Sequence, residues 1–261
     1  MSSKPIIVPQ ISLFALQGIP TVSPGDSIAS LVIEAYKHSG LEPKDGDIVV
    51  LAQKIVSKAE DRYVDLRKVI ASESAQDLSR TCLKDPRLVQ CILDESIGVV
   101  RCAPNLLIVR HRLGFVVANA GIDQSNISSD SPGDWVLLLP QEPDASAASI
   151  CDALCKLTGR NVGVAIIDSW GRAWRLGTSG ACLGAANVRT VLDLRGKPDL
   201  YGRSLQSTIV GIGDELAAGA SLLMGQAAEG TPIVVVRGAG LVGGKATARD
   251  LIRPISEDQF V

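Results

Sequence analysis

Two aspartates stand directly after apolar, strand-like runs, and they are the residues best suited to carry chemistry. In the segment FVVANAGIDQSN, Asp123 and Asn126 come after the apolar run, and in GVAIIDSWGR, Asp168 and Ser169 do so. A carboxylate that leaves a buried strand into a glycine-flanked loop can hold a hard divalent cation, which prefers oxygen ligands and keeps waters for a phosphate. Two such strand ends could share one ion. Either aspartate alone could instead cap a turn or a helix start.

After these aspartates, two segments of the chain are rich in cationic side chains and are interrupted by glycine or proline. GRAWRLG contains Arg172 and Arg175, and LRGKPDLYGR contains Arg195, Lys197 and Arg203. We interpret both segments as loops in which bidentate arginines recognise a phosphate or a carboxylate, although an ordinary solvated surface explains each segment equally well. Together with the aspartates, these cations favour phosphoryl transfer from a metal-bound nucleotide.

Two glycine patterns near the C-terminus imitate nucleotide-binding motifs. One pattern is G-x-G-x-x-G after the strand-like run PIVVVR, formed by Gly238, Gly240 and Gly243. We expect no dinucleotide-binding unit there, because too few residues follow Gly243 for the helix, strand and ribose-binding acid that complete it. Lys245 follows a glycine as in a P-loop, but Ala246 replaces the Ser or Thr that would hold magnesium. We therefore expect neither motif to bind a nucleotide.

The histidines and cysteines give no metal or nucleophile motif. His38 is expected at a helix end, and His111 stands in a strand-like run without a G-x-S-x-G nucleophile motif, which disfavours a hydrolase triad. The 6 cysteines have no C-x-x-C spacing, and Cys151 and Cys155 are one helical turn apart, as expected for small buried residues. We expect free thiols.

Composition excludes several classes of partner. The formal net charge is -2 and aromatic residues make up 3%, so neither a strong positive field nor a set of stacking platforms is available for nucleic acid. The first residues, MSSKPIIVPQISL, lack the apolar core of a signal peptide, and no run is long enough for a membrane span. We expect a soluble cytoplasmic protein that binds neither membrane nor nucleic acid.

The apolar patterns predict mixed helices and strands that position these residues. Helices are expected at residues 26–39, 73–83, 86–96, 146–157 and 214–225. Strands are expected at 48–56, 98–103, 106–112, 114–119, 135–140, 161–168, 190–194, 207–213 and 232–237. The three runs between 98 and 119 are close enough for antiparallel hairpins. The fold class is therefore α/β or mixed α+β, with parallel and antiparallel pairs, and a two-lobed arrangement has no boundary that the sequence places.

Six blocks of sequence, taken together, resemble the coenzyme F-420:L-glutamate ligase family, the γ-glutamyl ligases that extend the tail of a deazaflavin coenzyme. These blocks are residues 46–60, 118–126, 166–177, 195–203, 214–232 and 234–238. They keep the family's order and span nearly the whole chain. The resemblance implies one ligase domain over residues 1–261, an uncommon two-lobed α/β fold with mixed sheets, and an intertwined homodimer.

The resemblance also implies a chemistry and a set of site residues. It implies a GTP-dependent ligase that uses Mg²⁺ or Mn²⁺, with K⁺ assisting, and that adds L-glutamate to the carboxylate tail of an F-420 precursor through an acyl phosphate. The family's metal positions fall on Asp123, Asp168, Ser169 and Gln226, and the two aspartates are the expected catalytic residues. Its guanine-nucleotide contacts fall on Ile19, Pro20, Thr21, Val22, Gln53, Lys54, Lys58, Asn126, Met224, Gly225, Gln226, Ala227, Ala228, Glu229, Gly230 and Thr231.

Three other functions stay open. A ligase of the same family could act on a folate in place of the deazaflavin. A nucleotide-binding module without catalysis is a second class, against which the intact Asp123 and Asp168 argue. A dinucleotide oxidoreductase built on the loop at 238–243 is a third, and the short sequence after that loop argues against it.

Overall fold

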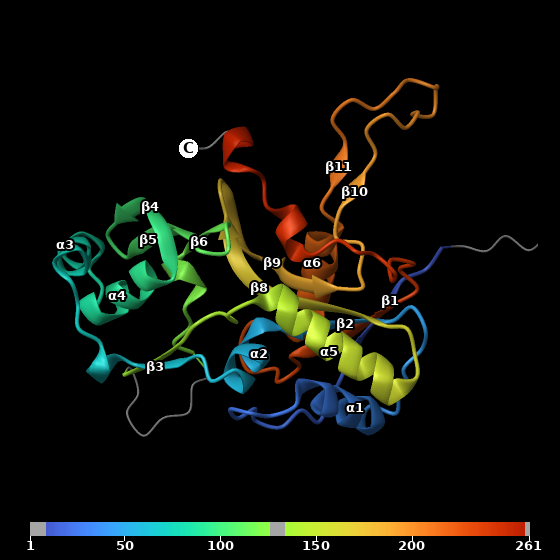
Figure 1. Ribbon diagram of the computed structural model, residues 1–261, viewed down its shortest axis with the longest axis horizontal. Coiled ribbons are helices and arrows are strands. Elements are labelled where there is room, and N and C mark those ends of the chain that lie inside the picture. Colours follow the sequence, from blue (N-terminus) through green and yellow to red (C-terminus); the bar gives the residue numbers. More distant parts are fainter. Residues whose placement is uncertain (1–8, 126–133, 259–261) are drawn as a thin grey trace, which may run out of the picture.

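A five-stranded mixed sheet forms the centre of the computed structural model, which describes residues 9–125 and 134–258 (Figure 1). Its strands, in spatial order, are β1 (Ser12–Ala15), β12 (Ile233–Arg237), β2 (Ile48–Ala52), β8 (Gly163–Arg172) and β9 (Arg175–Ala186). The pair β2 and β8 is parallel, and the other neighbouring pairs are antiparallel. The predicted class, with both kinds of strand pair, is confirmed.

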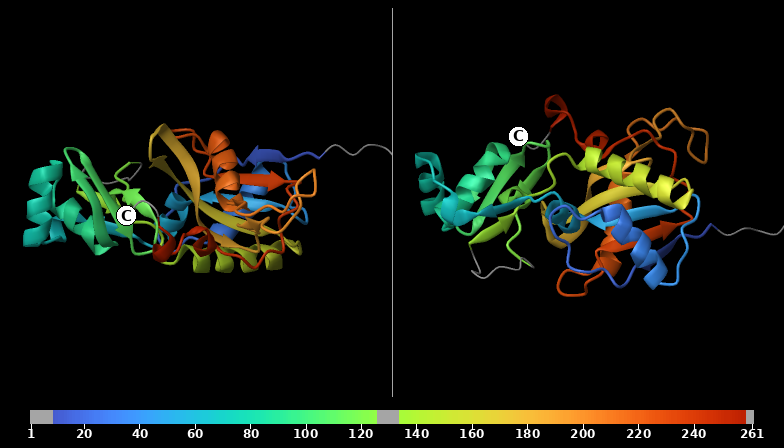
Figure 2. Two further views of the ribbon diagram at one scale, coloured as in Figure 1. Left: turned by 90° about the horizontal axis from the view of Figure 1, so that it is seen from above. Right: turned by 60° about the horizontal axis from the view of Figure 1, so that its bottom comes forward.

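Helices cover both faces of this sheet (Figure 2). On one face lie α1 (Ile28–His38) and α5 (Pro143–Thr158), and on the other lies α6 (Ile212–Met224). All three helices were predicted, with ends that differ by one to three residues from the expected ones. The sheet is therefore covered on both sides, which explains why its central strands read as continuous apolar runs.

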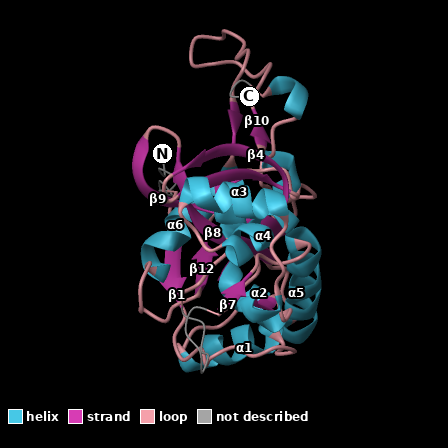
Figure 3. Cartoon of the chain, turned by 90° about the vertical axis from the view of Figure 1, so that its left-hand side faces the viewer, coloured by secondary structure: helices cyan, strands magenta, loops and turns pink. Residues whose placement is uncertain are grey.

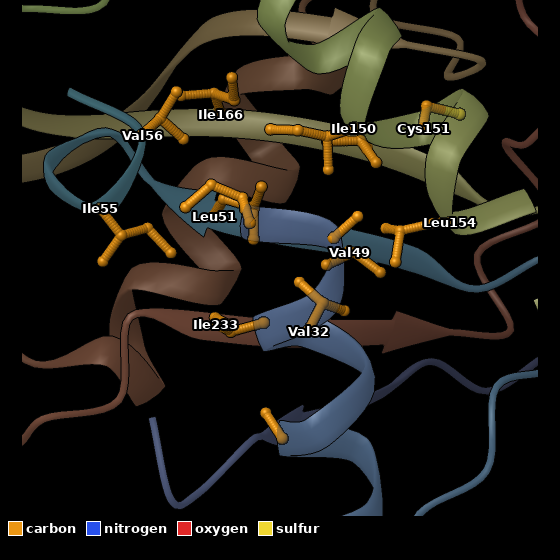
Figure 4. Packing of buried hydrophobic residues seen from close by; sticks show 14 of the residues in the cluster. Val32, Val49, Leu51, Ile55, Val56, Ile150, Cys151, Leu154, Ile166 and Ile233 are labelled. Atoms are coloured by element: carbon orange, nitrogen blue, oxygen red, sulfur yellow. The ribbon is translucent and has the colours of Figure 1, made fainter. Parts of the chain in front are cut away.

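Alternate residues of each strand enter different cores. In β2, Val49 and Leu51 contact the α1 and α5 side, where Ile166 of β8 joins them, whereas Ile48 and Val50 contact the α6 side. Figure 4 shows the first of these clusters, with side chains of the helices interleaved between those of the strands. Because the side-chain period of a strand is two, this packing fixes the register of the whole sheet.

A second group of elements forms a lobe at one side of the central sheet, seen at the left of Figure 1 and nearest the viewer in Figure 3. It contains α3 (Glu73–Cys82), α4 (Pro86–Asp94) and an antiparallel sheet of β4 (Ser96–Ala103), β5 (Leu106–His111) and β6 (Val116–Ala118). These elements share a core separate from those of the large sheet. Both predicted helices and the predicted hairpins are confirmed.

The chain crosses between the two parts twice, along a short two-stranded ribbon. It enters the small lobe through β3 (Tyr63–Asp65) and returns through β7 (Trp135–Leu137), which pairs antiparallel with β3. Near this crossing, Glu95 accepts hydrogen bonds from Arg62 and Arg112, each at 3.0 Å. Burial acts to raise the pKa of Glu95, but hydrogen bonds from His111 and the two guanidinium charges lower it to about 2.

Two sequence predictions are wrong, one for the end of β2 and one for the segment that joins β8 to β9. The strand predicted at 48–56 ends at Ala52, and α2 (Gln53–Ala59) follows it directly. The segment GRAWRLG is a strand hairpin and not a loop, because Arg172 ends β8 and pairs with Arg175 at the start of β9. Strand β9 is rich in glycine and alanine, and Thr178 is its single β-branched residue, so it lacks the run of β-branched residues that marks a strand in sequence.

The other basic segment lies in a hairpin arm that projects from the large lobe (Figure 1). Its base is the pair β10 (Leu192–Asp193) and β11 (Ile209–Val210), shorter than the two predicted strands. Arg195 is engaged within the arm, since its guanidinium bonds Asp193 at 2.6 Å. Within the described ranges, no helix is both long and apolar enough to cross a membrane.

We predict that Gly184→Ala destabilises the protein. A Cβ at this position of β9 would overlap the backbone of Pro143, the first residue of α5, so the strand and helix would have to separate. Overpacking of this kind costs about 1–3 kcal/mol of unfolding free energy. Urea unfolding measures the change, with Gly98→Ala as the control, because a Cβ at Gly98 meets open space and its φ is not positive. Equal stability of the two variants would contradict the packing argument.

Candidate active site

A cavity of about 960 Å³ opens between the two lobes, at the end of the central sheet. Its walls come from α2, from the end of β8, from the turn after β6 and from the loop that follows α6. The small lobe therefore supplies one wall and the large lobe the others. Segments far apart in the sequence meet here, and both aspartates singled out in the sequence line the same cavity.

Asp168 reaches the cavity because β8 continues beyond its buried apolar part. Ile166 and Ile167 fill the two cores, and Asp168 follows them at the half-buried position where the strand leaves the helices. Burial is the main cause that raises the pKa of Asp168 to about 6, and the negative charge of Asp123 adds to it. Hydrogen bonds from the Ser169 backbone N–H and the Gln53 side chain lower the pKa of Asp168, but they do not cancel this rise.

Asp123 comes from the small-lobe side, and both its backbone and its carboxylate are held by hydrogen bonds. Its backbone exchanges two hydrogen bonds of 2.9 Å with Leu137 of β7. Its carboxylate accepts the Ser125 N–H at 2.6 Å and forms an ion pair with Lys54 Nζ at 2.5 Å. Burial acts to raise the pKa of Asp123, but the bonds from Lys54 and Ser125 outweigh burial and hold the pKa below its ordinary value.

Helix α2 explains how two lysines face one cavity. Lys54 and Lys58 are four residues apart and therefore lie on the same side of the helix. Lys54 also donates to Ser125 Oγ at 3.1 Å. Burial, followed by the charge of Lys54, lowers the pKa of Lys58, and Asp123 opposes that shift. The helix thus presents two ammonium groups to a cavity that also contains two carboxylates.

The loop after α6 forms the wall opposite α2. Thr231 Oγ donates to the carbonyl oxygens of Leu223 and Met224 at 3.0 and 3.2 Å, which satisfies the C-terminal end of the helix. Glu229 accepts the Ala227 N–H at 2.8 Å, and such backbone hydrogen bonds lower the pKa of its carboxyl. These contacts curl the loop back on itself, so that a run of residues lines the cavity from 224 to 232.

A divalent cation fits the oxygen donors at this point. Ser169 Oγ donates to Gln226 Oε1 at 2.7 Å, so a hydroxyl and an amide oxygen lie beside the carboxylates. Two carboxylates that repel each other, one with its pKa raised, are the environment that a bound cation relieves. Within residues 9–125 and 134–258, no group of three His, Cys, Asp or Glu side chains could hold a metal, so the neutral oxygens are needed.

Most of the residues expected from the sequence line this one cavity. From the metal set these are Asp123, Asp168, Ser169 and Gln226, and from the nucleotide set Pro20, Thr21, Val22, Gln53, Lys54, Lys58 and the whole run 224–231. Ile19 does not line it and packs instead at the edge of the α1 core. Asn126 lies outside the described residues.

Several cavity residues have no counterpart in the sequence prediction. Trp170, Gly171 and Thr178 come from the β8–β9 hairpin, and Ser221 comes from the last turn but one of α6. Trp170 is two residues from Asp168, which is the only sequence signal that could have marked it. Gly171 follows it in β8, and Ser221 lies on a helix that the sequence predicted. Thr178 reaches the cavity through the pairing of β9, which the sequence did not predict.

Gly238 and Gly244, one from each of the two patterns that imitate nucleotide motifs, lie in close packing contacts. A Cβ on Gly238 would overlap the Gln10 carbonyl oxygen, and one on Gly244 would overlap the backbone of Arg189. The loop from 238 to 247 contributes no residue to the large cavity. The prediction that neither motif marks the site is consistent with this geometry.

Comparison with known proteins identifies the relatives of this chain. The family model described as F420-0:Gamma-glutamyl ligase matches residues 18–238. The coenzyme F420:L-glutamate ligase of Methanothermobacter thermautotrophicus is 43% identical over 252 residues, which cover 96% of this chain and 98% of that enzyme. The enzymes of the same name from Methanocaldococcus jannaschii and Archaeoglobus fulgidus are 44% and 37% identical, over 83% and 95% of this chain and 85% and 96% of their own lengths.

We predict that Asp168→Asn stabilises the metal-free protein at pH 8. The folded-state pKa of about 6 exceeds the ordinary 3.8, so the carboxyl of Asp168 favours folding most below pH 4 and loses that contribution as the pH rises through 6. The neutral amide avoids the loss, which amounts to about 3 kcal/mol of unfolding free energy at pH 8 and less at pH 5.

Thermal and urea unfolding in EDTA at both pH values measure this gain. The control is Asp193→Asn, because the pKa of Asp193 is lowered to about 2 by Arg195, and its loss should destabilise the protein at pH 8. A parent protein more stable than Asp168→Asn at pH 8 would show that the carboxylate is not strained by burial.

Proposed function

The chain belongs to the F420-0:γ-glutamyl ligase family, whose amide-forming reaction adds glutamate to an F420 precursor, and we propose that GTP and Mg²⁺ or Mn²⁺ drive this reaction in the large cavity. The observation that carries the proposal is the meeting of two carboxylates, two lysines and the loop at 224–231 around one space. A cavity of about 960 Å³ has room for a nucleotide together with the end of an acceptor.

The division of the cavity follows from its charges. Lys54 and Lys58 supply the positive charge that a triphosphate needs. The 224–231 loop, Thr21 and Val22 line the same cavity. We assign these residues to the binding of GTP. Trp170 and Thr178, which line the same cavity, are then left for the acceptor.

Asp123, Asp168, Ser169 and Gln226 would hold the divalent cation. When bound, the cation withdraws charge from the phosphate oxygens during phosphoryl transfer. Lys54 already neutralises Asp123, so the ammonium keeps this carboxylate charged before any cation arrives. Gln53 orients Asp168 from the first turn of α2, and its own amide oxygen accepts from Ser57 at 2.8 Å.

The reaction forms one amide bond and breaks one phosphoanhydride bond of GTP. A carboxylate of the acceptor attacks the γ-phosphorus of GTP, GDP leaves, and an acyl phosphate results. The amine of glutamate then attacks the acyl carbon; the C–N bond forms, the C–O bond to phosphate breaks, and the amine releases a proton. The protein's residues position the three reactants and exclude water, an effect that can lower a barrier by about 7–11 kcal/mol.

We also propose that the protein acts as a homodimer. Leu200 and Tyr201 are 99% and 90% exposed at the tip of the projecting arm, which is an unfavourable place for large apolar side chains in a monomer. Gel filtration coupled to light scattering measures the mass in solution.

We predict that Asp168→Asn abolishes ligation. The assay offers GTP, glutamate, Mg²⁺ or Mn²⁺ and either the F420 precursor or a folate, and mass spectrometry detects the added glutamyl unit. The parent should extend the F420 precursor, and a preference for the folate would support the alternative acceptor. Lys245→Ala is the matched control and should keep full activity, because Lys245 does not line the cavity. Normal turnover by Asp168→Asn would remove this residue from the site.

We predict that GTP and the divalent cation bind with positive coupling. Without a cation, the two carboxylates repel a triphosphate, so chelation should weaken GTP binding sharply, and Asp123→Ala should reduce the effect of added metal. Calorimetric titration of GTP at several Mg²⁺ concentrations measures the coupling. GTP affinity that does not depend on metal would contradict the assignment of Asp123.

A further inference from the structure

A second, smaller cavity of about 320 Å³ lies beside the large one, and Trp170 lines both. Its other walls are Arg172 at the end of β8, small residues of β9, and Asp214 and Glu215 in the first turn of α6. Trp170 is therefore shared by the two spaces. The proposed reaction assigns nothing to this cavity.

The floor of the small cavity is made by a close approach of β9 to α6. A Cβ on Gly180 would overlap the carbonyl oxygen of Ala217, so the strand and the helix touch through their backbones. Ala181 and Ala218 extend the same floor. With no large side chain on the floor, the space between Trp170, Arg172 and Glu215 is kept open.

Arg172 stands in an arrangement that favours an anion. It pairs across the hairpin with Arg175, and like charges directly opposite each other on neighbouring strands are destabilising. In the part of the chain that the structure describes, neither guanidinium has an ion pair with a carboxylate within 4.0 Å. A bound carboxylate would relieve the repulsion and match the planar fork of the guanidinium.

The two acidic residues of the small cavity differ in their roles. Asp214 is occupied, because its Oδ1 accepts the Cys182 N–H at 2.9 Å and so ties α6 to β9. Glu215 is exposed, and no ion pair of its side chain occurs among the described residues. One wall thus offers a guanidinium and another a carboxylate, within the same small space.

We propose that this small cavity binds the amino-acid substrate, with Arg172 bonding a carboxylate of glutamate and Glu215 attracting its ammonium group. Trp170 is two residues beyond Asp168, which is about 7 Å along an extended strand. Because Trp170 lines both cavities, an amino acid held beside it lies next to the space proposed for the phosphoryl transfer. The inference rests on the ligase reaction proposed above and adds the place from which its amine arrives.

The first test separates the substrates kinetically. Arg172→Ala should raise the KM for glutamate about tenfold or more and leave the KM values for GTP and the F420 precursor unchanged. The KM for glutamate of Arg172→Lys should lie between those of the parent and Arg172→Ala, because lysine keeps the positive charge but lacks the planar fork of the guanidinium. The matched control is Arg160→Ala, an exposed arginine before the other end of β8 that pairs with Asp45, and it should change none of these values.

A rise in the KM for the F420 precursor in place of glutamate would show that Arg172 recognises the acceptor's carboxylates and would overturn the proposal. Unchanged KM values for Arg172→Ala would overturn it equally. The thermal midpoint of Arg172→Lys should match the parent's, and that of Arg172→Ala should equal or exceed it, since the guanidinium makes no ion pair in the described structure and its removal relieves the repulsion with Arg175.

The second test needs no turnover. Saturation-transfer NMR with L-glutamate, and with glutarate as the analogue without an amino group, measures binding to the parent. Glu215→Gln should weaken the binding of L-glutamate and leave that of glutarate unchanged, and Arg172→Ala should weaken both. Equal loss of both ligands in Glu215→Gln would overturn the ammonium assignment. A parent that binds glutamate through these residues but forms no amide would contradict the proposed reaction and keep the subsite.

Discussion

The repulsion between Asp123 and Asp168 is the interaction on which the site depends. Both carboxylates line one cavity, burial raises the pKa of Asp168, and the charge of Asp123 raises it further. Lys54 compensates for one of the two negative charges. The structure tolerates the second because Asp168 sits at the end of a strand whose preceding residues are locked into two cores. In the proposed reaction, a bound divalent cation would offset this second negative charge.

Bringing these aspartates together requires the two lobes to be held in a fixed relation. The ribbon of β3 and β7 carries the chain across, and the buried Glu95 with its arginine partners anchors that crossing. Before Asp123, the backbone of Asn119, Ala120 and Gly121 is left-handed, with φ of 53°, 53° and 67°, which directs the chain from β6 toward the cavity. The ring of Phe115 in the small lobe packs against that of Trp170 in β8, tilted by 32° and with the ring centroids 4.8 Å apart. The residue that lines both cavities is thereby in contact with the small lobe.

Several glycines of this protein allow backbone segments to approach closely, although some of them are spaced as in nucleotide-binding motifs. Gly180 and Gly184 let β9 approach helices on both faces, and Gly238 and Gly244 let the C-terminal loop lie against the backbone. In the pattern G-x-G-x-x-G only Gly238 makes such a contact, whereas Gly240 and Gly243 have positive φ and would place a Cβ in open space. An α-helix does not follow the pattern in the described chain. The absence of a side chain, and not a phosphate, is what these positions share.

The sequence by itself determined the fold class, the apolar helices and strands, and the two aspartates, because burial imposes a period on apolar residues and a carboxylate at the end of such a run is conspicuous. The combined blocks also identified the family, which the comparisons confirm. Only the tertiary structure showed that β9 is a strand, that Arg172 pairs with Arg175 across the hairpin, and that Trp170 lines two cavities. These features depend on contacts between distant segments, where small residues make strands without a hydrophobic pattern and polar residues gain their meaning from their neighbours.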